Sequence, residues 1–170
     1  MSAHLTRIIS GGQTGADRAA LDFAIRHGIP HGGWCPHGRL AEDGAIDFRY
    51  RLRETPSAGY EQRTEWNVRD SDGTVIFSIA EQLVAGSKLT EELASRHGKP
   101  CLHMARGFAS HPAQLLHQFI AGHRIQVLNV AGPRVSTEPD IAIFTGSVLR
   151  AWWKEHRSSK ATGANLRVGH

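Results

Sequence analysis

The chain has 170 residues, a length typical of one domain and sufficient for a substantial hydrophobic core. Its 40% hydrophobic and 21% charged residues are those of a soluble globular protein, and no apolar run reaches the ~18 residues of a membrane span. The net charge of +4 fits a small anionic ligand, whereas the lack of a basic block argues against nucleic acid. With no signal-peptide pattern and only two cysteines, we expect a cytoplasmic protein with free thiols.

The first element is a short apolar run, Leu5–Ser10, which predicts a strand, and the pattern over 15–27 predicts a helix. Three glycines lie between them within five positions. Glycines let the backbone approach a ligand closely, and the first N–H groups of a helix favour negative charge. The pattern is neither G-x-G-x-x-G nor a P-loop, so on its own an ordinary strand–helix turn explains it equally well.

The segment that follows a short second strand at 29–33 has no clean periodicity. Residues 34–59 combine prolines, glycines and many charges with aromatic residues. Structureless loops of this length are uncommon in compact domains and are usually functional or disordered. We therefore predict an ordered loop at a ligand site, anchored by Trp34, Phe48, Tyr50 and Tyr60.

The rest of the chain alternates between strands and helices. A polar helix at 60–70 is solvent-facing or lines a polar site, and the apolar run 73–79 predicts a parallel strand buried on both faces. The later pattern predicts helices at 85–97, from Pro112 and at 140–155, and strands at 101–104 and 124–130. We expect one domain over residues 1–157 and a flexible tail over 158–170.

This alternation predicts an α/β fold: a three-layer, Rossmann-like open parallel sheet with helices on both faces. Ligands of such sheets bind at the carboxyl ends of the strands. Small-residue segments follow three strong strands, at 10–15, 85–90 and 131–136. We therefore expect them to form one shared anion site.

The same segments carry a family resemblance. Gly11–Asp22 resembles the start of the putative molybdenum carrier family, and further similar strings follow in order: Gly32–Pro36, Ala41–Gly44, Leu52–Pro56, Arg63–Asp72 and Leu128–Arg134. That family is a circularly permuted branch of the Rossmann-like superfamily of LOG (lysine-decarboxylase-like) proteins. The resemblance implies a phosphorylated or nucleotide-like ligand. Relatives bind molybdenum cofactor, a pterin phosphate that carries molybdate, without converting it, and are usually oligomeric.

The middle loop departs from the related hydrolases. LOG hydrolases carry a G-G-x-G-T-x-x-E motif, and alignment on Glu92 places Lys88 and Leu89 where that motif has glycine and threonine. Ala85-Gly86-Ser87 also replaces the Gly-Gly-Thr usual in the molybdenum carrier family. These differences argue against nucleotide hydrolysis.

We predict a binding site without catalytic residues, in which glycines cradle the anion and hydroxyl, amide and basic groups bind it. Its predicted members are Gly11, Gly12, Gln13, Thr14, Gly15, Asp17, Arg18, Trp34, Gly86, Ser87, Lys88, Thr90, Gly132, Arg134 and Ser136. Trp34 or Tyr60 would stack on a flat ring.

Each group also has a structural explanation. Asp17 suits the dipole of its own helix, Arg18 can pair with Asp22, and Ser87 or Thr90 can cap a helix. Arg134 and Ser136 can simply face solvent, and the set Arg53, Glu54, Arg63 and Asn67 can either line the pocket or form structural ion pairs.

A structural metal bound by side chains is not expected. Cys35-Pro36-His37 supplies two ligands without the partner pair of a tetrahedral zinc site, and the histidines lack a metal-binding spacing.

The leading hypothesis is a binding protein for molybdenum cofactor (molybdopterin) or a related phosphorylated pterin or nucleotide. It would be a homo-oligomer, dimer or tetramer, that hands its ligand to molybdoenzyme acceptors. The first alternative is a LOG-like nucleoside monophosphate phosphoribohydrolase with Glu92 or Asp17 as acid/base. The others are a sensor of a nucleotide-derived ligand and a single-stranded nucleic-acid binder.

Overall fold

Five parallel strands form the central sheet of the computed structural model, which describes the backbone of residues 4–164 and the side chains of residues 4–156. All strand pairs in this sheet are parallel, with Ile8 opposite Leu128 and Val75 opposite Val130. The spatial order is β2-β1-β9-β7-β8. The strands are β1 (Arg7–Ile9), β2 (His31–Gly32), β7 (Gly73–Ser78), β8 (Cys101–Ala105) and β9 (Val127–Ala131).

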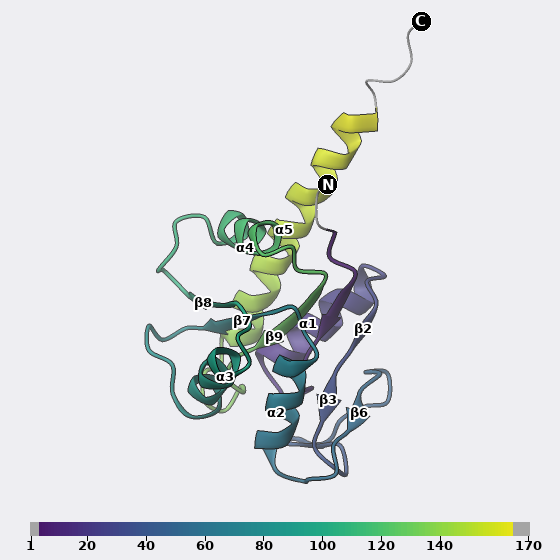
Figure 1. Cartoon of the computed structure of the whole chain (residues 1–170), viewed down its shortest axis with the longest axis vertical. Helices are drawn as coiled ribbons and strands as arrows, with labels where there is room; N and C mark the ends of the chain where they lie inside the picture. Colours follow the sequence, from purple (N-terminus) through teal and green to yellow (C-terminus); the bar gives the residue numbers. More distant parts are fainter. Residues whose placement is uncertain (1–3, 165–170) are drawn as a thin grey trace, which may run out of the picture.

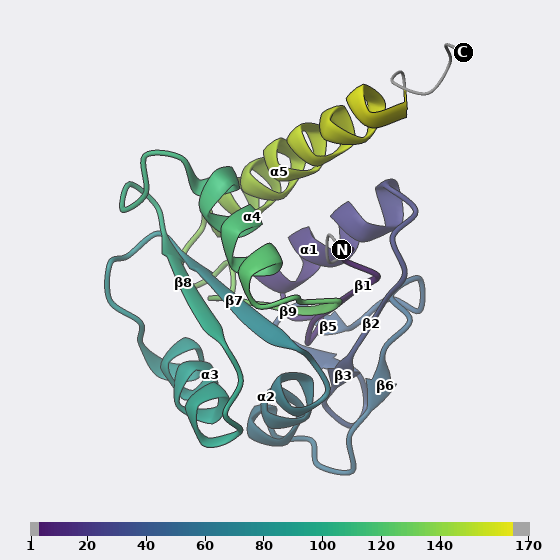
Figure 2. The same ribbon diagram turned by 45° about the horizontal axis from the view of Figure 1, so that its top comes forward.

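Helices cover both faces of the sheet (Figures 1 and 2). On one face α1 (Ala16–Arg26) and α4 (Pro112–Gly122) pack against the long α5 (Ile141–Ala164), and on the other α2 (Tyr60–Arg69) packs against α3 (Ala85–Arg96). This arrangement confirms the predicted three-layer, Rossmann-like architecture.

The core lies between the sheet and the helices. All six residues of β7 are buried, which explains the unbroken apolar run in the sequence. Phe77 on β7 and Leu128 on β9 are almost fully buried and belong to the main hydrophobic cluster. Leu149 and Trp152 join the same cluster from α5, so the last predicted helix closes the core.

The strand order brings three loops together. β9 is the last strand in the chain, yet it lies between β1 and β7. Because all three are parallel, the loops that follow them emerge side by side at one edge of the sheet. These are the glycine turn 10–15, the segment 79–84 that leads into α3, and the loop 132–140.

Residues 34–59 form a small unit whose apolar cluster also includes Leu21 of α1. β3 (Trp34–Cys35) pairs with β6 (Arg53–Glu54), and β4 (Leu40–Ala41) pairs with β5 (Gly44–Ala45) in a hairpin. The buried Arg39 guanidinium donates hydrogen bonds of 2.8–3.2 Å to the carbonyls of Ile46, Asp47, Tyr50 and Leu52. The segment is ordered, as predicted, because these bonds and a local apolar cluster hold it.

The last helix extends beyond its predicted end. Its backbone continues to Ala164, whereas the sequence pattern placed the end near Glu155. The predicted flexible tail is 158–170. The structure describes only the backbone of residues 158–164 and nothing of 165–170, so the flexibility of the tail stays a prediction. No helix among the described residues is long and apolar enough to cross a membrane, and Cys35 and Cys101 are free thiols.

A methyl group at Gly132 should destabilise this packing. An added Cβ would lie 2.6 Å from both the Ala16 Cβ and the Phe77 carbonyl oxygen. We expect Gly132→Ala to lower the free energy of unfolding by about 1–3 kcal/mol, measured by denaturant titration. Gly122→Ala is the matched control, since nothing lies within 4 Å of its added Cβ, and an equal loss in both variants would contradict the prediction.

Candidate functional site

A pocket of about 140 Å³ lies at the carboxyl edge of the central strands. Its walls come from the glycine turn after β1, the loop after β9, one face of α2 and the first turn of α3. The lining residues are Gly11, Gln13, Asp17, Tyr60, Arg63, Thr64, Asn67, Val84, Ala85, Gly86, Ser87, Leu89, Thr90, Asn129, Val130, Ala131, Gly132, Pro133, Arg134 and Thr137. Segments far apart in the sequence therefore meet at one site.

The polar helix α2 contributes one wall. Its lining residues Tyr60, Arg63, Thr64 and Asn67 are spaced three or four apart, so they share one helical face. Asn67 also connects α2 to β3. Its side-chain oxygen accepts a hydrogen bond from the Trp34 N–H at 2.8 Å, and its side-chain nitrogen donates to the Trp34 carbonyl at 2.9 Å. The polar helix lines a polar site, one of the two alternatives that its sequence left open.

The first turn of α3 faces the pocket without a capping side chain. Val84 is the N-cap residue, and no acidic residue lies in the first turn. The Thr90 hydroxyl donates to the Gly86 carbonyl at 2.8 Å, so it does not cap the helix. Because the first N–H groups of a helix have no intrahelical acceptor, this end of α3 favours an anion.

A buried ion pair between Asp17 and Arg63 lines the pocket. Arg63 Nη1 lies 2.9 Å from Asp17 Oδ2, and the two side chains are 14% and 4% exposed. Burial raises the pKa of the Asp17 carboxyl, and the ion pair with Arg63 opposes that shift. A Cβ at Gly11 would lie 1.5 Å from Arg63 Nη1, so only glycine lets the guanidinium settle on the turn.

Two buried donors at the pocket have no hydrogen-bond partner among the described residues: Gln13 Nε2 and Arg63 Nε. The Gln13 side-chain oxygen accepts from the N–H groups of Thr14 at 3.0 Å and Glu42 at 2.9 Å, which fixes the orientation of the amide. A buried polar group without a partner costs roughly 1–3 kcal/mol. A ligand that offers acceptors here would remove that cost.

Two guanidinium groups lie close to the Tyr60 ring at the pocket. The Cζ atoms of Arg134 and Arg63 are 5.1 and 5.5 Å from its ring centroid. The Tyr60 side chain is at the surface, with 37% of the residue exposed. This arrangement places two positive charges and an aromatic face at one side of the pocket.

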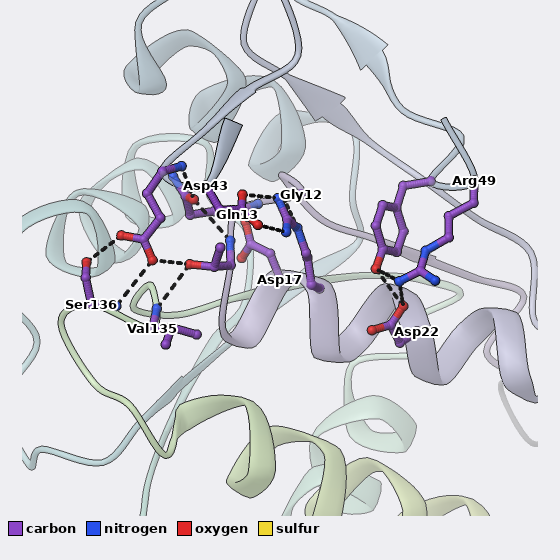
Figure 3. Close-up of polar contacts among 12 residues, drawn as sticks. Gly12, Gln13, Asp17, Asp22, Asp43, Arg49, Val135 and Ser136 are labelled. Carbon is purple, nitrogen blue, oxygen red and sulfur yellow. Dashed lines mark hydrogen bonds and ion pairs between the residues drawn. The ribbon is translucent and has the colours of Figure 1, made fainter. Parts of the chain in front are cut away.

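Three predicted ligand contacts instead bind an acidic turn, as Figure 3 shows. The hydroxyls of Thr14 and Ser136 both donate to the Glu42 carboxylate, and the Ser136 N–H lies 3.2 Å from it. Arg18 pairs with Asp43, Nη2 to Oδ1 at 2.7 Å, rather than with Asp22. The β4–β5 turn is thus bound to the first and third loops.

The other predicted residues divide between lining and support. Gly11, Gln13, Asp17, Gly86, Ser87, Thr90, Gly132 and Arg134 line the pocket. Gly12 and Gly15 have φ angles of 79° and 88° and allow close contacts with the segment 46–52 and with Pro133. Trp34 donates to Asp70 at 2.7 Å beneath the Arg53 guanidinium, and Lys88 is exposed outside the lining. Ligand contact by any of these residues stays a prediction.

Three polar lining residues were absent from the sequence-based candidates: Thr64, Asn129 and Thr137. Asn129 is the one with a recognisable signal. It is a polar residue inside the apolar strand β9, and its amide donates to the Thr74 hydroxyl at 3.2 Å. Among the side chains of residues 4–156, no group of three or more histidine, cysteine, aspartate or glutamate residues is arranged to hold a metal ion.

Comparison with known proteins identifies the family of this chain. Residues 8–153 match the model of the circularly permutated YpsA SLOG family. The chain belongs to this family. Its fold and sequence also resemble a crystal structure described as a putative molybdenum carrier protein from Syntrophus aciditrophicus SB. The two chains are 51% identical with a TM-score of 0.86, over 89% of this chain and 97% of the other. A search of curated proteins gave no significant match.

SLOG membership confirms the resemblance noted in the motifs. Together with the pocket, it indicates a ligand-binding role for this chain. The strand-end loops that the motifs span are the loops that form the pocket.

Removal of Arg63 should strongly destabilise this SLOG protein, because it leaves the buried Asp17 carboxylate unpaired. We expect Arg63→Ala to lower the free energy of unfolding by about 3–5 kcal/mol, measured by urea denaturation. Arg53→Ala is the control: its guanidinium stacks at 4.3 Å on Trp34 at the surface and should contribute less than about 1 kcal/mol. Equal losses would show that the ion pair is not essential.

Glu42 should titrate below its ordinary range. Hydrogen bonds from Ser136 and Thr14 lower the pKa of its carboxyl below 4.5. Its contribution to stability is therefore present above pH 4.5 and lost as the pH falls through the folded-state pKa. NMR titration of the carboxyl carbon should show this midpoint, and Thr14→Val should raise it while Thr6→Val leaves it unchanged. A midpoint at or above 4.5 in the unmodified chain would refute the assignment.

Proposed function

We propose that the pocket binds the phosphate or oxyanion end of molybdenum cofactor, or of a related phosphorylated pterin or nucleotide, and that the chain carries this ligand without converting it. The observation that carries the proposal is the uncapped first turn of α3, which faces Arg63 and Arg134 across the pocket. The name of the similar Syntrophus protein supports the choice of a molybdenum-containing ligand.

The charges at the pocket favour an anion. Two arginines and one acidic residue line it, and the acidic residue, Asp17, is already paired with Arg63. Arg134 thus supplies a positive charge without a lining carboxylate to neutralise it. Guanidinium groups and the N–H groups of a helix terminus are the donors that bind phosphate in many proteins.

The pocket is large enough for only one part of the proposed ligand. About 140 Å³ is less than the roughly 300 Å³ of a small ligand site, so the enclosed space suits a phosphate or oxyanion group. A flat ring would then lie at the open side, near the Tyr60 ring and the two guanidinium groups over it. Trp34, the other aromatic candidate, does not line the pocket.

The arrangement of acidic groups favours carriage over hydrolysis. Glu92 is exposed and does not line the pocket, and Asp17 accepts hydrogen bonds from both Arg63 and the Gln13 N–H. Neither carboxylate is placed as a free acid or base beside a ligand. A homo-oligomeric form and a hand-over to molybdoenzyme acceptors complete the proposed carrier role.

Molybdopterin binding tests the proposal directly. Stoichiometric protein should lengthen the lifetime of the free cofactor, followed by pterin fluorescence and metal content, and an unchanged lifetime would exclude a carrier role. Arg134→Ala should weaken binding by about 10- to 100-fold, since a hydrogen bond to a charged group contributes about 1.5–3 kcal/mol. Arg96→Ala removes the same charge from the far, exposed end of α3 and should leave the affinity unchanged.

A further inference from the structure

The Glu42 carboxylate lies where several donors converge. Thr14 and Ser136 direct their hydroxyls at it, and the Ser136 N–H adds a third bond at 3.2 Å. The Val135 N–H lies 3.2 Å from the Thr14 hydroxyl oxygen and orients that hydroxyl toward Glu42. Figure 3 shows these donors, from two separate strand-end loops, gathered around one negatively charged group.

Such a set of donors is typical of an oxyanion site. Hydroxyls and main-chain N–H groups that point at one position bind phosphate and carboxylate oxygens alike. The positive charge of Arg134, two positions before Ser136, further favours an anion there and helps to lower the Glu42 pKa. Here the chain itself supplies the anion.

The turn that carries Glu42 is held independently of that carboxylate. Arg18 binds Asp43 at 2.7 Å, and the Gln13 side-chain oxygen accepts from the Glu42 main-chain N–H at 2.9 Å. The preceding strand β4 and the following strand β5 close the hairpin. The side chain of Glu42 can therefore be changed while the turn keeps two anchors.

The Glu42 position adjoins the ligand pocket. Gln13 lines the pocket while the next residue, Thr14, binds Glu42. In the third loop, Arg134 and Thr137 line the pocket while Ser136, between them, binds Glu42. Donors to Glu42 therefore alternate with pocket-lining residues along both loops.

We propose that the Glu42 carboxylate occupies a second oxyanion site beside the pocket, so that the protein accepts ligands with a single phosphate or oxyanion group and rejects diphosphates. The proposal rests on the proposed function only for the first anion, which the pocket would bind. A second phosphate attached to the first would meet the negative charge of Glu42 and find its donors already taken. Specificity then arises from repulsion as well as from attraction.

Titration calorimetry with inorganic phosphate and pyrophosphate tests this. The unmodified chain should bind one phosphate and should bind pyrophosphate no more tightly than phosphate. Glu42→Ala should bind a second phosphate and gain tenfold or more in affinity for pyrophosphate. Asp47→Ala is the matched control, because it removes an exposed carboxylate from the same segment and leaves both Glu42 and the Arg18–Asp43 pair in place; it should still bind one phosphate.

A double variant tests whether the second phosphate binds at the position of the Glu42 carboxylate rather than elsewhere on a loosened turn. Adding Ser136→Ala to Glu42→Ala removes one hydroxyl donor of the vacated site and should weaken binding of the second phosphate by tenfold or more. Phosphate should also raise the thermal midpoint of Glu42→Ala more than that of Asp47→Ala, because a ligand that binds only the folded state stabilises it. If Glu42→Ala binds no second phosphate and shows no extra thermal stabilisation, the inference is wrong.

The outcomes separate this inference from the proposed function. No phosphate in the unmodified chain but one in Glu42→Ala would contradict the pocket as an anion site and support the role of Glu42. One phosphate in both proteins would support the pocket and overturn the role of Glu42. Tight pyrophosphate binding by the unmodified chain would also overturn the inference.

Discussion

The site depends on the position of β9 in the sheet. This strand pairs with β1 on one side and β7 on the other, and all three run parallel. Without it, the glycine turn and the segment before α3 would belong to separate halves of the sheet. Because β9 lies between them, its own loop, which carries Arg134, completes the pocket.

The buried ion pair between Asp17 and Arg63 joins this edge of the sheet to α2. It connects the start of α1 with a polar helix that buries few apolar residues. Gly11 makes the pair possible, since a side chain there would collide with the guanidinium. The glycine turn after β1 therefore has two roles: it leaves space for the Arg63 guanidinium, and it lines the proposed anion site.

The long segment 34–59 supports the site from outside. Arg39 binds four carbonyl groups and gives the segment a fixed shape. That shape presents the Glu42 and Asp43 turn to the first and third loops. The acidic turn binds donors that would otherwise attract anions, and neither of its carboxylates lines the pocket beside α3.

Much of the architecture could be read from the sequence. The apolar run 73–79 predicted a doubly buried strand because a parallel strand between two helical layers has no solvent-facing side. Arg63 and Asn67 were recognisable as members of a polar set that could line a pocket. Periodicity and the positions of glycines are local properties of the sequence, so they can be recognised without knowledge of the fold. The long motifs placed the chain in its family for the same reason.

Only the tertiary structure decided which donors face the pocket. The sequence alone marked Gly11–Arg18 as a ligand turn, and the fold divides that turn: Gln13 and Asp17 line the pocket, while Thr14 and Arg18 bind an acidic hairpin about 25–30 residues away. Neither the insertion of β9 nor the docking of that hairpin leaves a local pattern. Both arise from pairing between distant segments, and the direction of each side chain follows from that pairing.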